Sequence, residues 1–262
     1  MSGLGTGPYW IGPYDESGGF PDVSLALTEP NGLLAVGGNL TPKRLLDAYN
    51  KGIFPWYTDG QPILWWSPNP RAVLFPDKLN ISRSVLKTIR KEHFHVTIDQ
   101  AFEQVIQQCA APRADGNGTW LTQQMIEAYC SLHELGHAHS AECWHGDELV
   151  GGLYGVAIGR VFFGESMYSS HSNASKIAFI QLACQLKEWG YALIDCQVHS
   201  NYLQSLGATE IPREDYIKLI QHWTKVPGQE IPWSLDKKLI SSLIELQRQR
   251  KVILNQEPVQ KR

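Results

Sequence analysis

The sequence predicts an α+β fold, in which a mixed β-sheet is packed by helices and follows a small N-terminal domain. From residue 119 onward, apolar residues recur at helix or strand spacing in the order helix, three strands, helix, strand, helix, strand. Before this part, glycine, proline and tryptophan are frequent and long periodic segments are rare. We therefore expect a small domain over residues 1–72, a main domain over 73–233, and a helical extension with a polar tail over 234–262.

The composition is that of an ordinary globular protein, with 43% hydrophobic and 19% charged residues among 262, enough for a sizeable core. The net charge of −3 gives no overall positive field, so a nucleic-acid partner would need a local basic patch. Five widely spaced cysteines without a C-x-x-C motif are typical of a reducing cytosol. No signal peptide and no run of 18 apolar residues is present, so we expect a soluble, cytoplasmic protein.

In the N-terminal domain, residues 1–32 are rich in turn formers and are expected to wrap loosely onto the body. A short helix is predicted between Thr41, a good N-cap that precedes a proline, and Gly52, which ends it. The segment 54–75 contains Trp56, two further tryptophans and four prolines. Prolines are excluded from helix interiors and central strands, so this segment is predicted to be ordered but irregular.

A basic helix is predicted over residues 81–94, with apolar residues on one side. Its basic residues recur at i, i+4, i+7 and i+8 and so form one stripe, made of Arg83, Lys87, Arg90 and Lys91. The pattern fits either a solvated helix face or a surface that binds phosphates.

The following elements have regular patterns. A helix over 119–136 ends at Gly136, and strands over 139–145, 148–159 and 161–168 form an antiparallel meander with two tight turns. A largely apolar helix over 172–190 begins at Ser172 or Asn173 and ends at a glycine.

The last strands carry the first candidate site. An apolar run that opens at residue 191 leads into Asp195 and Gln197, which share one face because strand side chains alternate. A carboxylate there is costly to desolvate unless something uses it. A short helix over 200–207, a strand-like piece over 209–220 and an amphipathic helix over 234–253 complete the chain.

Two other kinds of site are disfavoured. His133, His137 and His139 suggest a metal, but Gly136 breaks the helix before His137 and the glutamate of an H-E-x-x-H motif is missing. The G-E-S-M-Y sequence begins like the nucleophile elbow of a serine hydrolase, but Tyr168 occupies the position of the second glycine.

The order of elements matches the acetyltransferase-like superfamily. Those enzymes hold the pyrophosphate of acetyl-CoA with a glycine-rich turn before the central helix, whereas the corresponding Y-S-S-H-S-N-A-S-K contains no glycine. We therefore expect an acetyltransferase-like fold with a different acyl donor.

Several segments between about residues 28 and 217 together resemble the leucyl/phenylalanyl-tRNA–protein transferase family. They are EPNGLLAVGGNLTPKRLLDAYNKGIFPW, ILWWSPNPRAVL, GTWLTQQMIEAY, LVGGLYG, GESMYSSHSNASK and IDCQ followed by SLGATEIPR. The resemblance implies a bacterial cytosolic enzyme of the N-degron pathway with an acetyltransferase-like C-terminal domain. Such an enzyme moves Leu or Phe, and less readily Met, from aminoacyl-tRNA to proteins that begin with Arg or Lys. No metal or nucleotide cofactor is implied.

The resemblance also implies residue roles. Asp195 and Gln197 are the expected catalytic pair, with Gln197 in contact with the attacking amine and Asp195 polarising the pair or accepting the proton. Glu165 lies in an apolar strand, which tolerates a carboxylate best beside a cation. That cation is either on the first residue of the acceptor or the α-ammonium of the donor.

The donor side chain and the terminal adenosine are expected to contact Trp56, Trp120, Leu153, Phe162 and Met167. Leu153 replaces the methionine usual in the family. M-Y-S-S-H-S lacks the arginine often found just after this motif, which leaves a phosphate contact there open. The basic stripe is the expected tRNA surface. The alternatives are another acyl or aminoacyl transferase on this fold and a non-catalytic module that binds the tRNA end, against which the retained polar residues argue.

Overall fold

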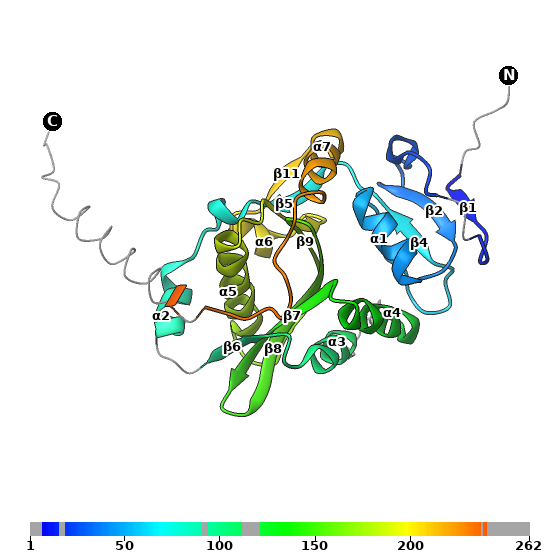
Figure 1. The fold of residues 1–262 in the computed structure, drawn as a ribbon. Coiled ribbons are helices and arrows are strands. Elements are labelled where there is room, and N and C mark those ends of the chain that lie inside the picture. Colours follow the sequence, from blue (N-terminus) through cyan, green and yellow to red (C-terminus); the bar gives the residue numbers. More distant parts are fainter. Residues whose placement is uncertain (1–6, 16–18, 91–93, 112–120, 237, 240–262) are drawn as a thin grey trace, which may run out of the picture.

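Two β-sheets with surrounding helices make up the computed structural model, which describes residues 7–15, 19–90, 94–111, 121–236 and 238–239 (Figure 1). Within these residues, a small sheet has the strand order β1-β2-β4-β3 and a large sheet the order β11-β5-β10-β9-β8-β7-β6. The α+β class that the sequence predicts is confirmed.

The strands of the small sheet are β1 (Tyr9–Ile11), β2 (Leu33–Gly37), β3 (Phe54–Pro55) and β4 (Leu64–Trp66). Those of the large sheet are β5 (Arg71–Leu74), β6 (His95–Ile98), β7 (Ala138–His145), β8 (Glu148–Ile158), β9 (Val161–Ser169), β10 (Leu193–Gln197) and β11 (Thr209–Ile211). The helices are α1 (Pro42–Asn50), α2 (Arg83–Arg90), α3 (Phe102–Ala110), α4 (Gln123–Glu134), α5 (Ala174–Glu188), α6 (Asn201–Ser205) and α7 (Arg213–Trp223), with 3-10 turns at Val23–Leu25 and Pro76–Lys78.

The predicted antiparallel meander of β7, β8 and β9 forms the centre of the large sheet. Strand β10 pairs with β9 in parallel. Two consecutive parallel strands need a crossover connection, and helix α5 provides it. Helix α5 packs on one face of the sheet, while α3 and α4 lie on the other (Figure 1). Each face has its own buried apolar cluster, and the cluster on the α3 and α4 side continues into the small sheet and α1.

The predicted ends of α1 are confirmed. The side chain of Thr41 accepts a hydrogen bond from the backbone N–H of Arg44, and Pro42 is the first helical residue. Gly52 follows the helix with φ +74°, and a Cβ at this position would lie 2.6 Å from Ile217 Cδ1. Both the left-handed backbone and the close contact require glycine. Of the two residues predicted to begin α5, Ser172 and Asn173, the N-cap is Asn173. Its side chain makes no capping hydrogen bond.

The prediction of irregular structure over residues 54–75 is wrong in part. Strands β3, β4 and β5 lie within this segment. Three of its prolines fall between strands rather than inside them, and Pro55 lies in β3, the edge strand of the small sheet, where a missing N–H is tolerated. The segment therefore alternates short strands with proline-containing turns.

The strand-like piece over 209–220 is also corrected. Only Thr209–Ile211 is a strand, and Pro212 precedes the helix α7, whose buried residues Tyr216 and Ile220 are four positions apart. This spacing places both on one helix face, so burial of that face favours a helix over a longer strand. Strand β10 begins at Leu193, two residues later than expected, and the predicted terminal helix over 234–253 lies almost wholly outside the described residues.

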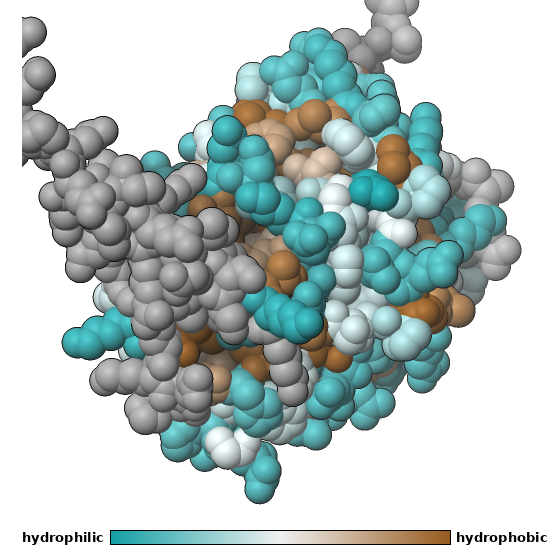
Figure 2. Space-filling model, turned by 60° about the vertical axis from the view of Figure 1, so that its left-hand side comes forward, coloured by the Kyte–Doolittle hydropathy of each residue, from teal (hydrophilic) through white to brown (hydrophobic). Residues whose placement is uncertain are grey.

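Hydrophilic side chains cover most of the face shown in Figure 2, and hydrophobic ones are visible between them in several separate places. Of the helices that the structure describes, none is long and apolar enough to cross a membrane.

Candidate active site

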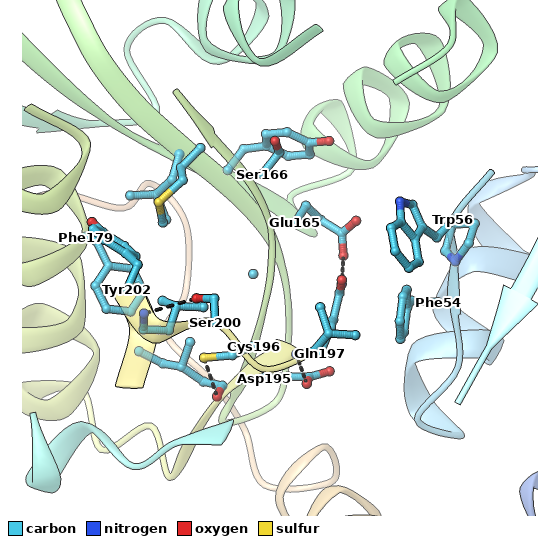
Figure 3. A pocket seen from close by; sticks show the side chains of 18 residues that line it. Phe54, Trp56, Glu165, Ser166, Phe179, Asp195, Cys196, Gln197, Ser200 and Tyr202 are labelled. Carbon is cyan, nitrogen blue, oxygen red and sulfur yellow. Dashed lines mark hydrogen bonds between the residues drawn. The ribbon is translucent and has the colours of Figure 1, made fainter. Parts of the chain in front are cut away.

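A cavity of about 430 Å³ lies where β9 and β10 part (Figure 3). The two strands pair only from Leu193 opposite Val161 to Asp195 opposite Phe163. Beyond these positions both continue without pairing to each other, which opens a gap in the sheet between them. The cavity therefore exists because β9 and β10 stop pairing at this point.

The two halves of the cavity differ in chemistry. One half is apolar and is lined by core residues from five elements, namely Leu153, Met167, Phe179, Ile194 and Leu203. The other half carries Glu165 and Gln197, which face Phe54 and Trp56 from the N-terminal part of the chain (Figure 3). An apolar side chain and a polar or cationic group can thus be held next to each other.

A β-bulge places Glu165. Tyr154 pairs with Ser166 and the next residue, Gly155, pairs with Gly164, so Glu165 has no partner on β8. Bulges of this kind change the direction of a side chain and are common next to active sites. A Cβ on Gly155 would overlap the carbonyl oxygen of Phe163, so only glycine fits here.

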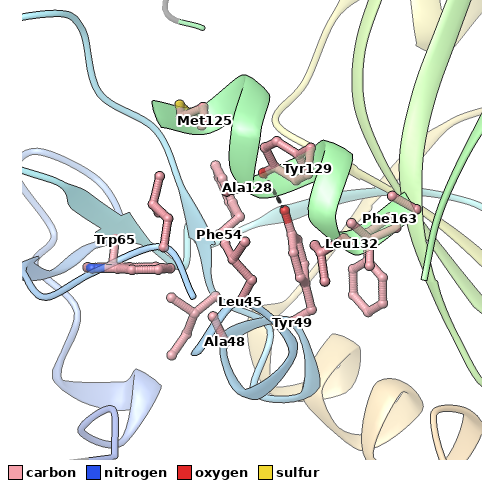
Figure 4. Packing of buried hydrophobic residues seen from close by; sticks show 14 of the residues in the cluster. Leu45, Ala48, Tyr49, Phe54, Trp65, Met125, Ala128, Tyr129, Leu132 and Phe163 are labelled. Carbon is pink, nitrogen blue, oxygen red and sulfur yellow. Dashed lines mark hydrogen bonds between the residues drawn. The ribbon is translucent and has the colours of Figure 1, made fainter. Parts of the chain in front are cut away.

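Three side chains from three elements contact the Glu165 carboxyl group. Tyr49 on α1 lies 2.8 Å from Oε1, and Tyr129 on α4 lies 2.7 Å from Oε2. The Gln197 amide donates to Oε1 over 2.9 Å. The two phenol oxygens are also only 2.6 Å apart, a contact visible in Figure 4 between α1 and α4. The site thus joins the N-terminal domain to the large sheet.

Burial raises the pKa of Glu165 to about 7, because desolvation disfavours the carboxylate. The hydrogen bonds from Tyr129, Tyr49 and Gln197 act in the opposite direction, and the nearby negative charge of Asp195 adds to the increase. Burial likewise raises the pKa of both tyrosines far above its ordinary value, so they remain protonated donors.

Asp195 is fully buried and surrounded by donors. Its Oδ1 accepts from Arg71 Nε over 2.8 Å and from the backbone N–H of Gln197 over 2.9 Å. Its Oδ2 accepts from a terminal guanidinium nitrogen of Arg71 over 2.6 Å and from Tyr216 over 2.8 Å. Both lone pairs of each oxygen are thus engaged. The arrangement holds Asp195 as a paired anion.

Gln197 owes its position to this pairing. It has φ +62°, a left-handed conformation that is uncommon for a residue other than glycine, and it follows an irregularity in the register of β10 with β5. Its backbone N–H is held by Asp195, which fixes this conformation. Strain of this kind is typical of active sites. With Nε2 on Glu165, Oε1 is the end of the Gln197 side chain that can accept from an amine.

Sequence reasoning did not identify Arg71 and Tyr216. Arg71 lies between the rings of Phe54 and Tyr216, at 4.7 and 4.6 Å from their centroids. Burial lowers the pKa of Arg71, but Asp195 and Tyr216 together outweigh this effect and raise that pKa above its ordinary value. The signal was present, because an arginine directly before the apolar Ala-Val-Leu of β5 needs a partner when buried.

Two sequence profiles match the chain. Residues 73–221 match leucyl/phenylalanyl-tRNA protein transferase, and residues 38–69 match the N-terminal domain of the same family. The chain is 56% identical over 218 residues to a leucyl/phenylalanyl-tRNA–protein transferase of Cellvibrio japonicus, covering 83% of this chain and 92% of that relative. The chain belongs to the leucyl/phenylalanyl-tRNA–protein transferase family. This confirms the resemblance and the class of enzyme, a transferase.

A second member of the family, from Nitrosospira multiformis, is 54% identical over 221 residues, covering 84% of this chain and 95% of that relative. Among solved structures, the chain is similar to a GCN5-related N-acetyltransferase from Kribbella flavida, with 12% identity and a TM-score of 0.32 over 67% of this chain and 63% of that one.

The residues expected to bind substrates in a leucyl/phenylalanyl-tRNA–protein transferase are only partly brought together. Trp56, Leu153 and Met167 line the cavity, as does Glu165. Phe162 does not line it, because it is fully buried beneath the sheet with its ring 6.4 Å from that of Trp233. Trp120 lies outside the described residues.

The expected tRNA surface falls on α2, where Val85 and Leu86 are buried and Lys87 is exposed on the opposite side. Arg83 and Arg90 are the first and last residues of this helix, and Lys91 lies outside the described residues.

The histidines near the start of β7 have separate structural contacts. His133 Nδ1 lies 2.8 Å from the carbonyl oxygen of Ala138. His139 lies 2.7 Å from Asp99 and stacks on Trp233 with 3.6 Å between ring centroids. These contacts explain two of the three residues by packing.

Proposed function

We propose that the chain transfers Leu or Phe, and less readily Met, from aminoacyl-tRNA to the α-amino group of proteins that begin with Arg or Lys. The modified proteins would enter the N-degron pathway. The family match supports the reaction, and the cavity with an apolar half beside a carboxylate supports the choice of substrates. Since charged tRNA is a cytoplasmic substrate, the proposal places the reaction in the cytoplasm.

In this proposal, the apolar half of the cavity holds the side chain of the donor amino acid. Leu153, Met167 and Phe179 would bury its carbon atoms, and each buried methylene contributes about 0.8 kcal/mol. Trp56 is 44% exposed at the other side of the cavity, and such a ring suits a flat partner such as the terminal adenine. The stripe on α2 would contact the tRNA phosphates.

Glu165 would bind a cationic group of the substrates. Its place in an apolar strand and in the cavity favours such a partner, because a buried carboxylate is stable only when a cation compensates its charge. Within the described part of the chain it forms no ion pair, so a substrate cation would be its first charged partner. A carboxylate in a desolvated cavity binds a guanidinium more strongly than one in water.

The reaction needs no further activation of the donor, because an aminoacyl ester is already activated. The enzyme needs to hold the ester and a neutral α-amine together, and positioning alone supplies much of the rate. We propose that Gln197 Oε1 accepts a hydrogen bond from the attacking amine. Asp195 would polarise and position Gln197 rather than take the proton, since its four lone pairs are engaged.

The test uses the purified protein, tRNA charged with labelled Leu, and three peptides that differ only in their first residue, Arg, Lys or Ala. We expect label on the Arg and Lys peptides and little on the Ala peptide. Treatment of the charged tRNA with RNase beforehand should abolish the transfer. Equal labelling of the Ala peptide, or transfer that survives RNase, would contradict the proposal.

A further inference from the structure

The contacts around Glu165 form a closed ring of oxygen atoms. Tyr49 and Tyr129 each lie within 2.8 Å of one Glu165 oxygen, and their own oxygens are 2.6 Å apart. A close approach of two oxygens is stable only with a proton between them. Three such contacts therefore need three protons.

The two phenols supply only two of these protons, because each hydroxyl carries one. With an ionised Glu165, one of the three contacts would join two lone pairs without a proton. With a protonated Glu165, the carboxyl group donates to one tyrosine, that tyrosine to the other, and the second back to the carboxyl group. Every contact in the ring is then a hydrogen bond, and the Gln197 amide still donates to Oε1.

Among the residues that the structure describes, the surroundings of this ring add no positive charge of their own. The titratable and charged groups near Glu165 in these residues, from every element packed against it, are Tyr49, Tyr129, Tyr154, Cys196, Asp195 and Arg71. The tyrosines are neutral, and the charge of Arg71 is matched by Asp195 in a buried pair with both side chains about 1% exposed or less. A proton on Glu165 therefore keeps the unliganded cavity neutral.

We propose that Glu165 carries a proton in the unliganded protein and releases it to solvent when a cationic group of a substrate binds. This inference rests on the proposed function, in which such a group is the first charged partner of Glu165. The cation replaces the proton, so the cavity stays neutral in both states. Tyr49 and Tyr129 are positioning residues, which hold the carboxyl group when it is protonated and donate to both of its oxygens when it is ionised.

The exchange makes cation binding depend on pH. The pKa of Glu165, raised by burial to about 7, agrees with the proton count. Below that pH the proton must first be removed, so the affinity for a cation should weaken about tenfold for each pH unit. Above it the affinity should be constant for a guanidinium, whereas an α-ammonium should bind more weakly again as it loses its own proton near pH 7.7–8.0.

Two competitive inhibitors show whether the cation comes from the acceptor or from the donor. The inhibitor that mimics the acceptor has no free α-amine, so it cannot react. N-acetyl-arginine amide offers the guanidinium alone, and leucinamide offers the α-ammonium of the donor. Their neutral counterparts are N-acetyl-citrulline amide and N-acetyl-leucinamide. Inhibition constants are measured between pH 5.5 and 8 against transfer of Leu to the Arg peptide, with the full-length protein.

We expect one of the two cations to inhibit about tenfold more weakly per pH unit below 7, and its neutral counterpart to show no such trend. Calorimetry of that competitor at pH 6 in two buffers of different ionisation enthalpy should report release of about 0.9 proton, as a carboxyl group with a pKa of about 7 requires. Glu165→Gln should bind the cation weakly and with no dependence on pH.

Removal of a donor tests the role of the ring. Tyr129→Phe removes the contact between the two phenols, so Tyr49 can donate to an ionised Glu165 and no oxygen–oxygen contact is left without a proton. The midpoint of the inhibition profile should therefore move to lower pH. Tyr168→Phe is the matched control. Tyr168 lies on β9, as Glu165 does, but its described hydrogen bond goes to the backbone carbonyl of Leu149 and not to Glu165. It should leave the midpoint unchanged.

Failure of the inference differs from failure of the proposed function. If Leu is transferred to the Arg peptide but neither cation inhibits, or if the inhibition constants do not change with pH, Glu165 is not a proton-exchanging cation site. A midpoint that moves equally in Tyr129→Phe and Tyr168→Phe would exclude the ring as its cause. If no Leu is transferred to any peptide, the proposed function itself is wrong.

Discussion

The side chain of Gln197 donates to Glu165 over 2.9 Å and so links β10 to β9 at the point where the two strands part. Both residues lie at irregularities of their strands, one in a bulge and the other with a left-handed backbone. Through Asp195 the link continues to Arg71, and through Glu165 it continues to Tyr49 on α1. Substitutions at either end of this network should therefore affect the same cavity.

Arg71→Met should destabilise the protein by about 3–5 kcal/mol, because it leaves the buried Asp195 carboxylate without its cation. Urea unfolding measures the change. Lys51→Met is the control, since Lys51 forms a partly exposed pair with Asp47 and should cost no more than about 1 kcal/mol. Similar losses in both variants would mean that the buried pair has no special role.

Tyr216→Phe should lower kcat while leaving KM for the charged tRNA unchanged. The hydroxyl of Tyr216 donates to Asp195, so its loss loosens the anion that holds the backbone of Gln197 without changing any charge. Stability should fall by only about 1 kcal/mol, as for a typical hydrogen bond. A change confined to KM would argue against positioning of Gln197 by this route.

Glu165→Gln should change how stability depends on pH. The pKa of Glu165 is raised from 4.5 to about 7, so the folded state binds more protons than the unfolded state in this range. The wild type should therefore lose stability as pH rises through this range, whereas the variant lacks the group. Unfolding free energies at pH 4.5 and pH 8 test this, and the variant should gain relative to the wild type at pH 8. If the difference in unfolding free energy between the variant and the wild type is the same at both pH values, the raised pKa of Glu165 is contradicted.

Leu153→Phe should hurt transfer of Phe more than transfer of Leu, because it narrows the apolar half of the cavity. In the wild type, Leu should be preferred over Ala by roughly 2–3 kcal/mol for its three additional carbons. Ile has the same number of carbons as Leu, and its branch at Cβ should exclude it by shape. Competition between tRNAs charged with Leu, Phe and Ile measures these preferences, and equal use of Ile and Leu would contradict this account of the cavity.

Alanine at Arg83, Lys87, Arg90 and Lys91 should raise KM for tRNA and flatten its dependence on salt by roughly one log–log unit for each phosphate that is no longer neutralised. Lys218→Ala is the control, since Lys218 is an exposed lysine paired with Glu214 on α7. A small aminoacyl-adenosine donor should be used equally well by both proteins. Equal impairment with that donor and with whole tRNA would remove the stripe from the tRNA surface.

Local patterns predicted α1, α2 and the succession from α4 to α6, but they gave no sign of the strands β1, β2 and β6 or of the helix α3. Thr41, Pro42 and Gly52 mark the ends of α1, and the meander of β7, β8 and β9 follows from alternation and two glycine turns. Such signals depend on neighbours within a few residues, which the sequence shows directly. The same approach failed over 54–75 and 209–220, where burial of short segments against distant ones selected strand or helix.

The sequence by itself determined the family, the α+β class and the polar residues Glu165, Asp195 and Gln197 as candidates. Only the tertiary structure decided how these are used, because their partners are far away in the chain. Arg71 is 124 positions from Asp195, and Tyr49 is 116 positions from Glu165. Whether Asp195 is paired and Glu165 neutral depends on burial and on donors that only folding brings within 3 Å, and neither property is encoded in local spacing.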